Sequence, residues 1–293
     1  MTNQTMTRTM TIVQVSDTHL SETHAYFIDN FRVFADDMAA LKPDLIVHTG
    51  DVSFNGPARP ADLAFARRQL DSLGIPMLVL AGNHDIGEAP RHSRLNQPLD
   101  EARLAAWTDA FGPLFWRHDL PGWRLIGLDT ALMASDRREE REQIAFLDDA
   151  LSTLEGRKAI VFMHMPPFQD DPEDPRPTTS AVPFEARVAL LDRLEQGGVS
   201  VIACGHLHVY RQLVHRGMEI VWAPTTAMVS IEKQFRHWQV WTRPGYLVWR
   251  IEGAAISHEL VEPRLMIGMD TSRWTEIGGT TTNMPERPLR RFA

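Results

Sequence analysis

Residues 11–19 read Thr-Ile-Val-Gln-Val-Ser-Asp-Thr-His, an apolar run that ends in an aspartate and a histidine. Similar apolar runs with polar endings recur along the chain. The recurring endings are Gly50-Asp51, Gly82-Asn83-His84-Asp85, His164 before Met165-Pro166, and Gly205-His206-Leu207-His208. Each run reads as a β-strand, and ligands collect outside the carboxyl ends of the strands in an open parallel sheet. The sequence therefore predicts that five segments deliver carboxylate, amide and imidazole groups to one edge.

Strand and helix patterns alternate through the first two-thirds of the chain. The expected strands are 11–16, 44–49, 77–81, 123–128, 158–163 and 199–204. The expected helices are 29–41, 61–73, 100–111, 139–154 and 183–196. This alternation with short connections predicts an α/β fold, in which a mainly parallel sheet is covered by helices.

The pattern changes after residue 209, where strand candidates replace helices. These candidates are 209–214, 219–222, 238–242, 246–251 and 255–261. We expect them to form a second sheet packed against the first, with the indoles of Trp222, Trp238, Trp241 and Trp249 in the core. The expected organisation is a disordered lead-in (1–9), a single domain (10–262) and a C-terminal surface tail (263–293).

Composition restricts the class of protein. The chain has 293 residues, a net charge of −8 and one cysteine. The absence of a basic surplus argues against binding to a nucleic acid polymer, although metal ions can supply local positive charge for a small phosphate ester. One cysteine permits no internal disulfide, and neither a signal core nor a membrane-spanning run is visible. We expect a cytoplasmic protein without a membrane partner; a homo-oligomer remains open.

The polar endings contain oxygen and nitrogen donors but no thiolate. The potential metal ligands are Asp17, His19, Asp51, Asn83, His164, His206 and His208. Asp17 and His19 are two residues apart, so on an extended strand end they share one face. Asp51 follows Gly50, which permits close approach, and its two oxygens allow it to bridge two ions. This donor set favours Mn²⁺, Fe²⁺/Fe³⁺ or Zn²⁺ in an open catalytic site.

Each motif also has a structural interpretation when it is taken alone. Gly50-Asp51 after a strand is typical of a turn, and 83–85 of an Asx-type turn. His164 is open to interpretation as a hydrogen-bonded histidine at a strand end, and 205–208 as a helix cap. The coincidence of all the motifs at one end of predicted strands favours a shared site, since the chain contains only twelve histidines.

The ordered motifs resemble those of the calcineurin-like metallophosphoesterases, over about residues 11–262. The Asn-His-Asp form and the Gly-His-x-His ending resemble the class III cyclic-nucleotide phosphodiesterase and glycerophosphodiesterase branch most closely. The resemblance implies a four-layer α/β/β/α sandwich of two mixed sheets flanked by helices. It also implies two divalent metal ions, one held by Asp17, His19, Asp51 and His208 and the other by Asp51, Asn83, His164 and His206.

The resemblance further implies hydrolysis of a small phosphodiester, a cyclic nucleotide or a glycerophosphodiester. A hydroxide held by both ions would attack phosphorus in line with the leaving group. His84 would face the substrate and stabilise the transition state or protonate the departing alkoxide, while Asp85 would either orient His84 or cap the following turn. The alternatives are a phosphomonoesterase, for which Arg91, Arg94 or Arg236 would supply donors, and a non-enzymatic metal-binding scaffold.

Several other residues have structural interpretations. We expect His48 to be a packed or hydrogen-bonded core histidine, Cys204 a small core residue, Asp129 a structural cap and His24 a surface residue. The long loops 86–98 and 168–183 are expected to form pocket walls, since long loops in compact domains are often functional.

Overall fold

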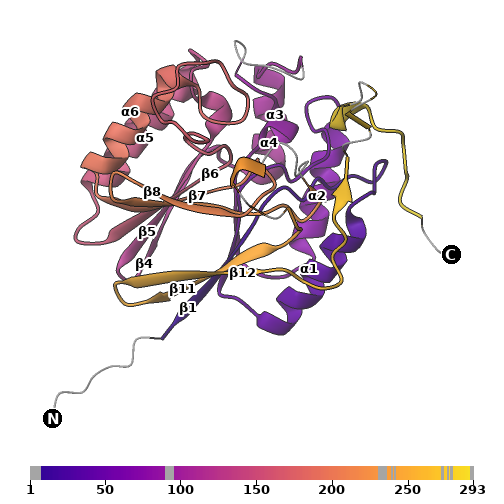
Figure 1. Ribbon diagram of the computed structural model, residues 1–293, viewed down its shortest axis with the longest axis horizontal. Coiled ribbons are helices and arrows are strands. Elements are labelled where there is room, and N and C mark those ends of the chain that lie inside the picture. The colour runs from indigo at the N-terminus through magenta and orange to yellow at the C-terminus, as the bar shows by residue number, and fades with distance from the viewer. Residues whose placement is uncertain are drawn as a thin grey trace.

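Two β-sheets lie face to face in the centre of the molecule, and helices cover both outer sides (Figure 1). The computed structural model describes residues 8–89, 96–229, 236–238, 240, 242–271, 274–275, 277 and 280–290. The expected lead-in therefore lies outside the described residues up to position 7, and the first strand begins at Met10.

One sheet has five strands in the order β12-β11-β1-β2-β3. Its strands are β1 (Met10–Val15), β2 (Leu45–His48), β3 (Met77–Val79), β11 (Tyr246–Glu252) and β12 (Ala255–Val261). The first three are parallel to one another, whereas β11 is antiparallel to both β1 and β12. The carboxyl ends of β1, β2 and β3 therefore lie together at one edge.

The other sheet has six strands in the order β4-β5-β6-β7-β9-β8. Its strands are β4 (Trp116–Leu120), β5 (Trp123–Leu128), β6 (Lys158–Met163), β7 (Val199–Cys204), β8 (Arg211–His215) and β9 (Met218–Trp222). The four central strands are parallel, and β4 and β8 are antiparallel edge strands.

Shorter elements and helices complete the described chain. The helices are α1 (Ile28–Leu41), α2 (Pro60–Asp71), α3 (Asn83–Ile86), α4 (Glu101–Phe111), α5 (Arg138–Ser152) and α6 (Phe184–Gln196). Short 3-10 helices span Thr130–Leu132, Arg236–Trp238 and Thr281–Asn283. The two short strands β10 (Met228–Val229) and β13 (Met269–Asp270) pair in parallel.

Three apolar clusters separate the layers. Inward-facing side chains of both sheets, including Val47, Phe162 and Trp249, form the cluster between them. A second cluster lies where α1, α2 and α4 pack on the five-stranded sheet, and a third where α5 and α6 pack on the six-stranded sheet. The expected four-layer α/β/β/α arrangement is confirmed.

The expected division of the strands between sheets is wrong. The strands expected after residue 209 do not form a second sheet together, because β8 and β9 extend the six-stranded sheet and β11 and β12 extend the sheet of β1. Hydrophobic periodicity identifies a strand but does not specify its neighbour. The expected strand 238–242 is also absent where the structure describes it, since Trp238 ends a 3-10 helix. The edge strand β4 was not expected; its middle residues are exposed and polar.

The indoles of Trp222 and Trp249 are buried, as expected, and Trp238 packs partly buried on the cluster below α5 and α6. Trp241 lies outside the described residues. The C-terminal tail follows the surface but is tied to the domain: Arg287 exchanges backbone hydrogen bonds with Thr23 and Ala25. Of the described helices, none has the length and apolar character needed to cross a membrane.

Candidate metal centre

The polar endings of five strands meet between the two sheets. Asp17, Asp51 and Asn83 follow strands of the five-stranded sheet, whereas His164 and His206 follow strands of the six-stranded sheet. The candidate site therefore lies where the carboxyl edges of both sheets face each other. In open parallel sheets, this edge is the usual place for a ligand site.

The first group of converging donors consists of Asp17, His19, Asp51 and His208. His208 Nε2 lies 3.2 Å from Asp17 Oδ1 and 3.3 Å from His19 Nε2. His19 Nε2 in turn lies 3.7 Å from Asp51 Oδ2. Two carboxylates and two imidazoles thus point into one small space, which is a suitable donor set for a divalent transition metal.

The second group consists of Asp51, His164 and His206, and Asn83 belongs beside it. His164 Nε2 lies 3.4 Å from Asp51 Oδ2 and 3.2 Å from Asn83 Oδ1. His206 Nδ1 lies 3.1 Å from the same His164 nitrogen. All seven side chains expected to be ligands are therefore brought together, in the two sets that the family resemblance implies.

Backbone carbonyls fix the orientation of three of the histidines. His164 Nδ1 lies 2.8 Å from Thr49 O, His206 Nε2 lies 2.7 Å from Thr179 O, and His208 Nδ1 lies 2.7 Å from Met228 O. A carbonyl only accepts, so each of these nitrogens carries a proton, and in the neutral ring the other nitrogen presents a lone pair to the centre.

The centre thus collects acceptors that face one another. When both rings are neutral, no hydrogen lies between His164 Nε2 and His206 Nδ1, which are 3.1 Å apart, and Asp51 Oδ2 lies 3.4 Å from the same His164 nitrogen. Cations relieve such mutual repulsion, so these residues fit the pair of metal ions that the fold family implies.

The shifted pKa values of His164 and Asp51 also show that the centre attracts positive charge. Burial alone would lower the pKa of His164, but the carboxylates of Asp51 and Asp17 outweigh it and raise that pKa to about 10. Burial would raise the pKa of Asp51, yet the surrounding histidines hold it well below its usual range. A proton on His164 therefore partly neutralises the anionic centre, and metal binding has to release it.

The backbone around the site adopts uncommon conformations. Five of the seven candidate ligands have positive φ angles, between 44° and 70°: Asp17, His19, Asp51, His206 and His208. Positive φ is uncommon for residues with a side chain, and such strain is concentrated at functional sites. It allows each short loop after a strand to turn its side chains back towards the centre.

Two glycines make the close approach possible. Gly50 has a φ of +99°, and a Cβ atom there would lie 2.6 Å from His164 Nδ1. A Cβ atom on Gly82 would lie 2.2 Å from Asp51 Oδ1. Both positions leave room for a candidate ligand of another segment, which agrees with the expectation for Gly50.

His84 lies beside the centre at the start of α3. Its ring and the ring of His19 are in edge contact, with centroids 4.7 Å apart, and its Nδ1 lies 2.9 Å from Phe54 O. Asp85 Oδ1 accepts hydrogen bonds from Ser53 N and Oγ, and Oδ2 accepts from Val52 N and Gly82 N. Asp85 therefore caps α3 and fastens the loop after Asp51, while a carbonyl orients the His84 ring.

The remaining sequence expectations have mixed outcomes. His48 is buried and hydrogen-bonded to Thr18, Cys204 is buried, and Asp129 caps a 3-10 helix through Ala131 N. His24 was expected at the surface but is 2% exposed, because its ring stacks on Phe54 and binds Met284 O.

The structural role of Thr179 and Met228 could not be predicted. Each acts on a histidine through its backbone carbonyl, a group that every residue type carries. The only signal in the sequence was the length of the loop 168–183.

Residues 10–210 match the family model for calcineurin-like phosphoesterases, and the chain belongs to this family. A protein named "Probable glycerophosphodiester phosphodiesterase" from Arcobacter nitrofigilis is 29% identical over 208 residues, covering 68% of this chain and 72% of that protein. A cAMP/cGMP dual specificity phosphodiesterase of Mycobacterium tuberculosis is 30% identical over 228 residues, 71% of this chain and 66% of that protein. A human serine/threonine-protein phosphatase is 27% identical over 179 residues, 57% of this chain and 54% of that protein.

Solved structures support the same fold. A purple acid phosphatase from yellow lupin superposes with a TM-score of 0.65 at 13% identity, covering 97% of this chain and 58% of that one. A dimetal phosphatase from Danio rerio superposes with a TM-score of 0.57 at 14% identity, covering 86% of this chain and 97% of that one. The chain thus spans little more than half the length of the lupin enzyme.

Proposed function

We propose that the protein is a dinuclear metal-dependent phosphodiesterase that hydrolyses a small phosphodiester of the cyclic-nucleotide or glycerophosphodiester class. The observation that carries the proposal is the position of Asp51 Oδ2, 3.7 Å from His19 Nε2 and 3.4 Å from His164 Nε2. One carboxylate oxygen thus lies between two sets of donors, as a bridging ligand requires.

Bound divalent cations would neutralise charge on the phosphoryl oxygens and make a water molecule more acidic. The protein contributes the geometry: carbonyls hold the histidine tautomers, and buried carboxylates compensate the cationic charge. Oxygen and imidazole donors without a thiolate suit Mn²⁺, Fe²⁺/Fe³⁺ or Zn²⁺.

His84 is the candidate proton donor to the leaving group. Its Nδ1 lies 2.9 Å from the carbonyl oxygen of Phe54, which fixes the orientation of the ring. We propose that a proton on Nε2 is transferred to the departing oxygen. His84 lies next to the ring of His19 and therefore beside the first group of donors. It is not a member of either group.

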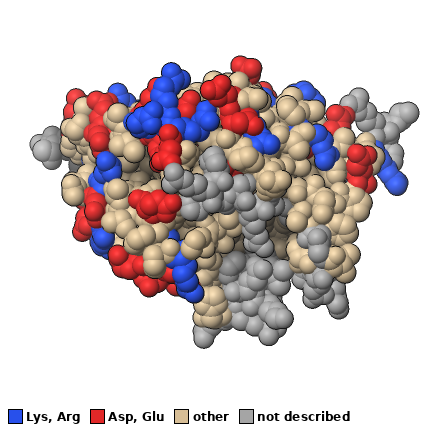
Figure 2. Space-filling view, turned by 90° about the horizontal axis from the view of Figure 1, so that it is seen from above, with Lys and Arg blue, Asp and Glu red and all other residues tan. Residues whose placement is uncertain are grey.

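Charge supports a diester in preference to a monoester. In the part of the chain that the structure describes, Asp17 and Asp51 form ion pairs with histidines only. The five motif segments also contain no lysine or arginine, so the single charge of a diester suits the cations better than the two charges of a monoester. Basic and acidic side chains are interspersed on the face in Figure 2, which offers no stripe for a polymer. Two of the relatives are also named as phosphodiesterases.

A phosphomonoesterase would need arginines to bind the second charge of its substrate. Arg91 and Arg94 lie outside the described residues, as does the side chain of Arg236. They remain the candidate donors for a phosphomonoesterase, a class that the phosphatase relative represents.

The test is a hydrolysis panel with purified protein loaded with Mn²⁺, combined with metal analysis. The substrates are bis-p-nitrophenyl phosphate, p-nitrophenyl phosphate, cyclic AMP and glycerophosphocholine. We expect two ions per chain and a higher kcat/KM for a diester than for p-nitrophenyl phosphate. A preference for the monoester would establish the phosphomonoesterase instead, and metal binding with no hydrolysis would favour the scaffold.

A further inference from the structure

The loop 168–183, between β6 and α6, touches the metal centre through Thr179. The carbonyl of Thr179 receives the Nε2 proton of His206 at 2.7 Å. The other nitrogen of that ring, Nδ1, faces His164 Nε2. The position of one loop carbonyl therefore determines which nitrogen of His206 is presented to the second donor group.

A buried guanidinium joins the two limbs of this loop. Arg187, in the first turns of α6, is 2% exposed. Its Nη1 donates to the carbonyls of Asp171, Pro172 and Asp174 at 3.0–3.3 Å. Its Nε and Nη2 donate to Val182 O at 3.3 and 3.2 Å. One limb precedes Thr179 and the other follows it, so a single side chain closes the loop around it.

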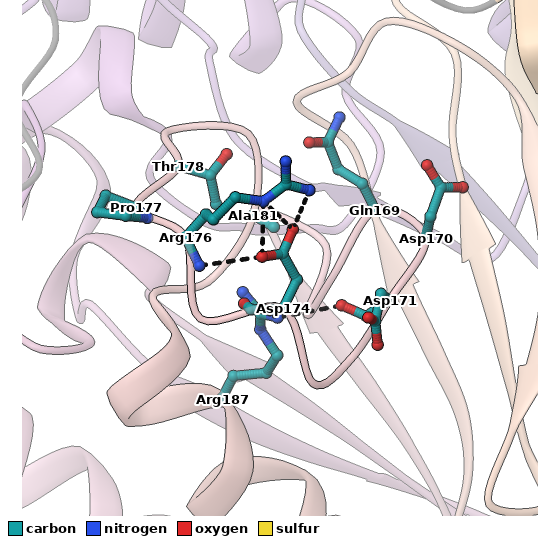
Figure 3. Close-up of a pocket in the computed structure, with 9 residues that line it drawn as sticks. All are labelled: Gln169, Asp170, Asp171, Asp174, Arg176, Pro177, Thr178, Ala181 and Arg187. Atoms are coloured by element: carbon teal, nitrogen blue, oxygen red, sulfur yellow. Dashed lines mark hydrogen bonds and ion pairs between the residues drawn. The ribbon is translucent and has the colours of Figure 1, made fainter.

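Apolar packing fixes the two ends of the loop, where Phe168 and Val182 are buried in the cluster of the six-stranded sheet, whereas residues 169–178 between them are mostly polar or proline. A cavity of about 320 Å³ opens beneath it, and polar side chains of the loop, among them Gln169, Asp171 and Asp174, surround that cavity together with Arg187 (Figure 3). In that polar part of the loop, the hydrogen bonds of Arg187 hold the backbone. The fixed fork of a guanidinium suits this task, because its donors point in several directions from one plane.

From these contacts we infer that Arg187 is a positioning residue for the second metal group: it holds the limbs of loop 168–183 so that Thr179 O fixes the tautomer of His206. The effect of Arg187 on catalysis rests on the proposed function. The contacts themselves do not depend on bound metal: Arg187 donates to the loop carbonyls on both sides of Thr179, and His206 donates to Thr179 O.

The experiment compares Arg187→Met with Arg176→Met. Arg176 lies in the same loop and lines the same cavity, but its side chain is 84% exposed and its guanidinium pairs with the Asp174 carboxylate. Mn²⁺ binding is measured by calorimetry, and the His206 tautomer of the metal-free protein by long-range ¹H–¹⁵N NMR. Hydrogen exchange reports on peptides that cover residues 168–183.

For Arg187→Met we expect one of the two Mn²⁺ dissociation constants to rise about 10–100-fold, the range typical of lost partners of metal-binding histidines. The other constant should stay unchanged, exchange in the loop should accelerate, and His206 should no longer be held as the Nε2–H tautomer. Arg176→Met should match the wild type. Arg187→Lys keeps the charge without the fork, so it should show the same selective change at smaller size, and it serves as the test if Arg187→Met does not fold.

Equal weakening of both Mn²⁺ sites, or an unchanged His206 tautomer in both Arg187 variants, would overturn the inference. The two proposals fail separately. A wild type without metal-dependent hydrolysis defeats the proposed function, whereas the tautomer and exchange data on metal-free protein still decide the role of Arg187.

Discussion

The backbone N–H of His84 donates a 2.7 Å hydrogen bond to Asp51 Oδ1. This bond occupies one oxygen of the carboxylate and leaves Oδ2 facing His19 and His164. The candidate bridging ligand and the candidate proton donor are therefore fixed to each other through the main chain, whatever side chain stands at position 84.

The orientation of Asp51 makes Asp51→Asn a sharp test of bridging. The amide oxygen of the variant has to face the His84 N–H, so its NH₂ group faces His19 and His164 and offers no lone pair to an ion. We expect both ions to be lost together and turnover to fall beyond the ~10–100-fold typical of changes outside the ligand set. Elemental analysis of the folded variant measures this, with the exposed Asp29→Asn as control. Retention of one ion at full affinity would contradict bridging by Asp51.

His84→Ala should separate chemistry from metal binding. The variant retains the backbone N–H that orients Asp51, so metal content should stay near that of the wild type. Turnover should fall by ~10²–10⁴-fold for a poor leaving group and less for a nitrophenolate, which needs little protonation. The exposed His118→Ala is the control. Equal losses for all leaving groups would assign His84 to charge stabilisation, and loss of metal would make it a ligand.

Much of this site could be predicted because each donor comes within four residues of the end of an apolar strand. The observed bounds of β5, β6 and β7 are those expected from the sequence, and the parallel arrangement then places the residues after β6 and β7 side by side. The residue pattern alone indicated the strands that precede the donors, their order along the chain and the polar groups that follow them.

The remaining features depend on contacts that leave no mark on periodicity. β11 pairs with β1 in antiparallel orientation although more than two hundred residues separate the two strands. The alternation of apolar residues along a strand is the same whichever sheet the strand joins. Arg187 reads as an ordinary residue of an amphipathic helix, yet it is buried because the carbonyls of a loop satisfy its donors. The carbonyls of Thr179 and Met228 carry no residue-specific signal.

The hydrogen bonds of Asp85 lead to a prediction that differs from an orienting role. Its two oxygens accept from three backbone N–H groups and one hydroxyl, so Asp85→Asn places an NH₂ group against at least one donor. We expect unfolding to become easier by ~1–3 kcal/mol and affinity for both ions to decrease, because the loop that carries Asp51 loosens. Denaturant unfolding and metal titration check this, with the exposed Asp36→Asn as control. A loss of turnover at unchanged stability and metal affinity would instead support orientation of His84.

The buried carboxyl of Asp129 should make the stability of the fold depend on pH. Burial raises its pKa to about 7, only partly opposed by the hydrogen bond from Ala131 N, and Oδ2 has no hydrogen-bond partner among the described residues. Because the folded state holds this proton more tightly than the unfolded chain, the contribution of Asp129 to the stability of the wild type falls as pH rises from about 4 to about 7. Asp129→Asn keeps the acceptor for Ala131 N and cannot ionise. The difference between its free energy of unfolding and that of the wild type should therefore grow across that pH window in favour of the variant, by ~2–4 kcal/mol from the size of the shift. Urea unfolding of metal-free protein at several pH values measures the difference, and a difference between the two proteins that does not change with pH would show that Asp129 is ionised in the folded state throughout.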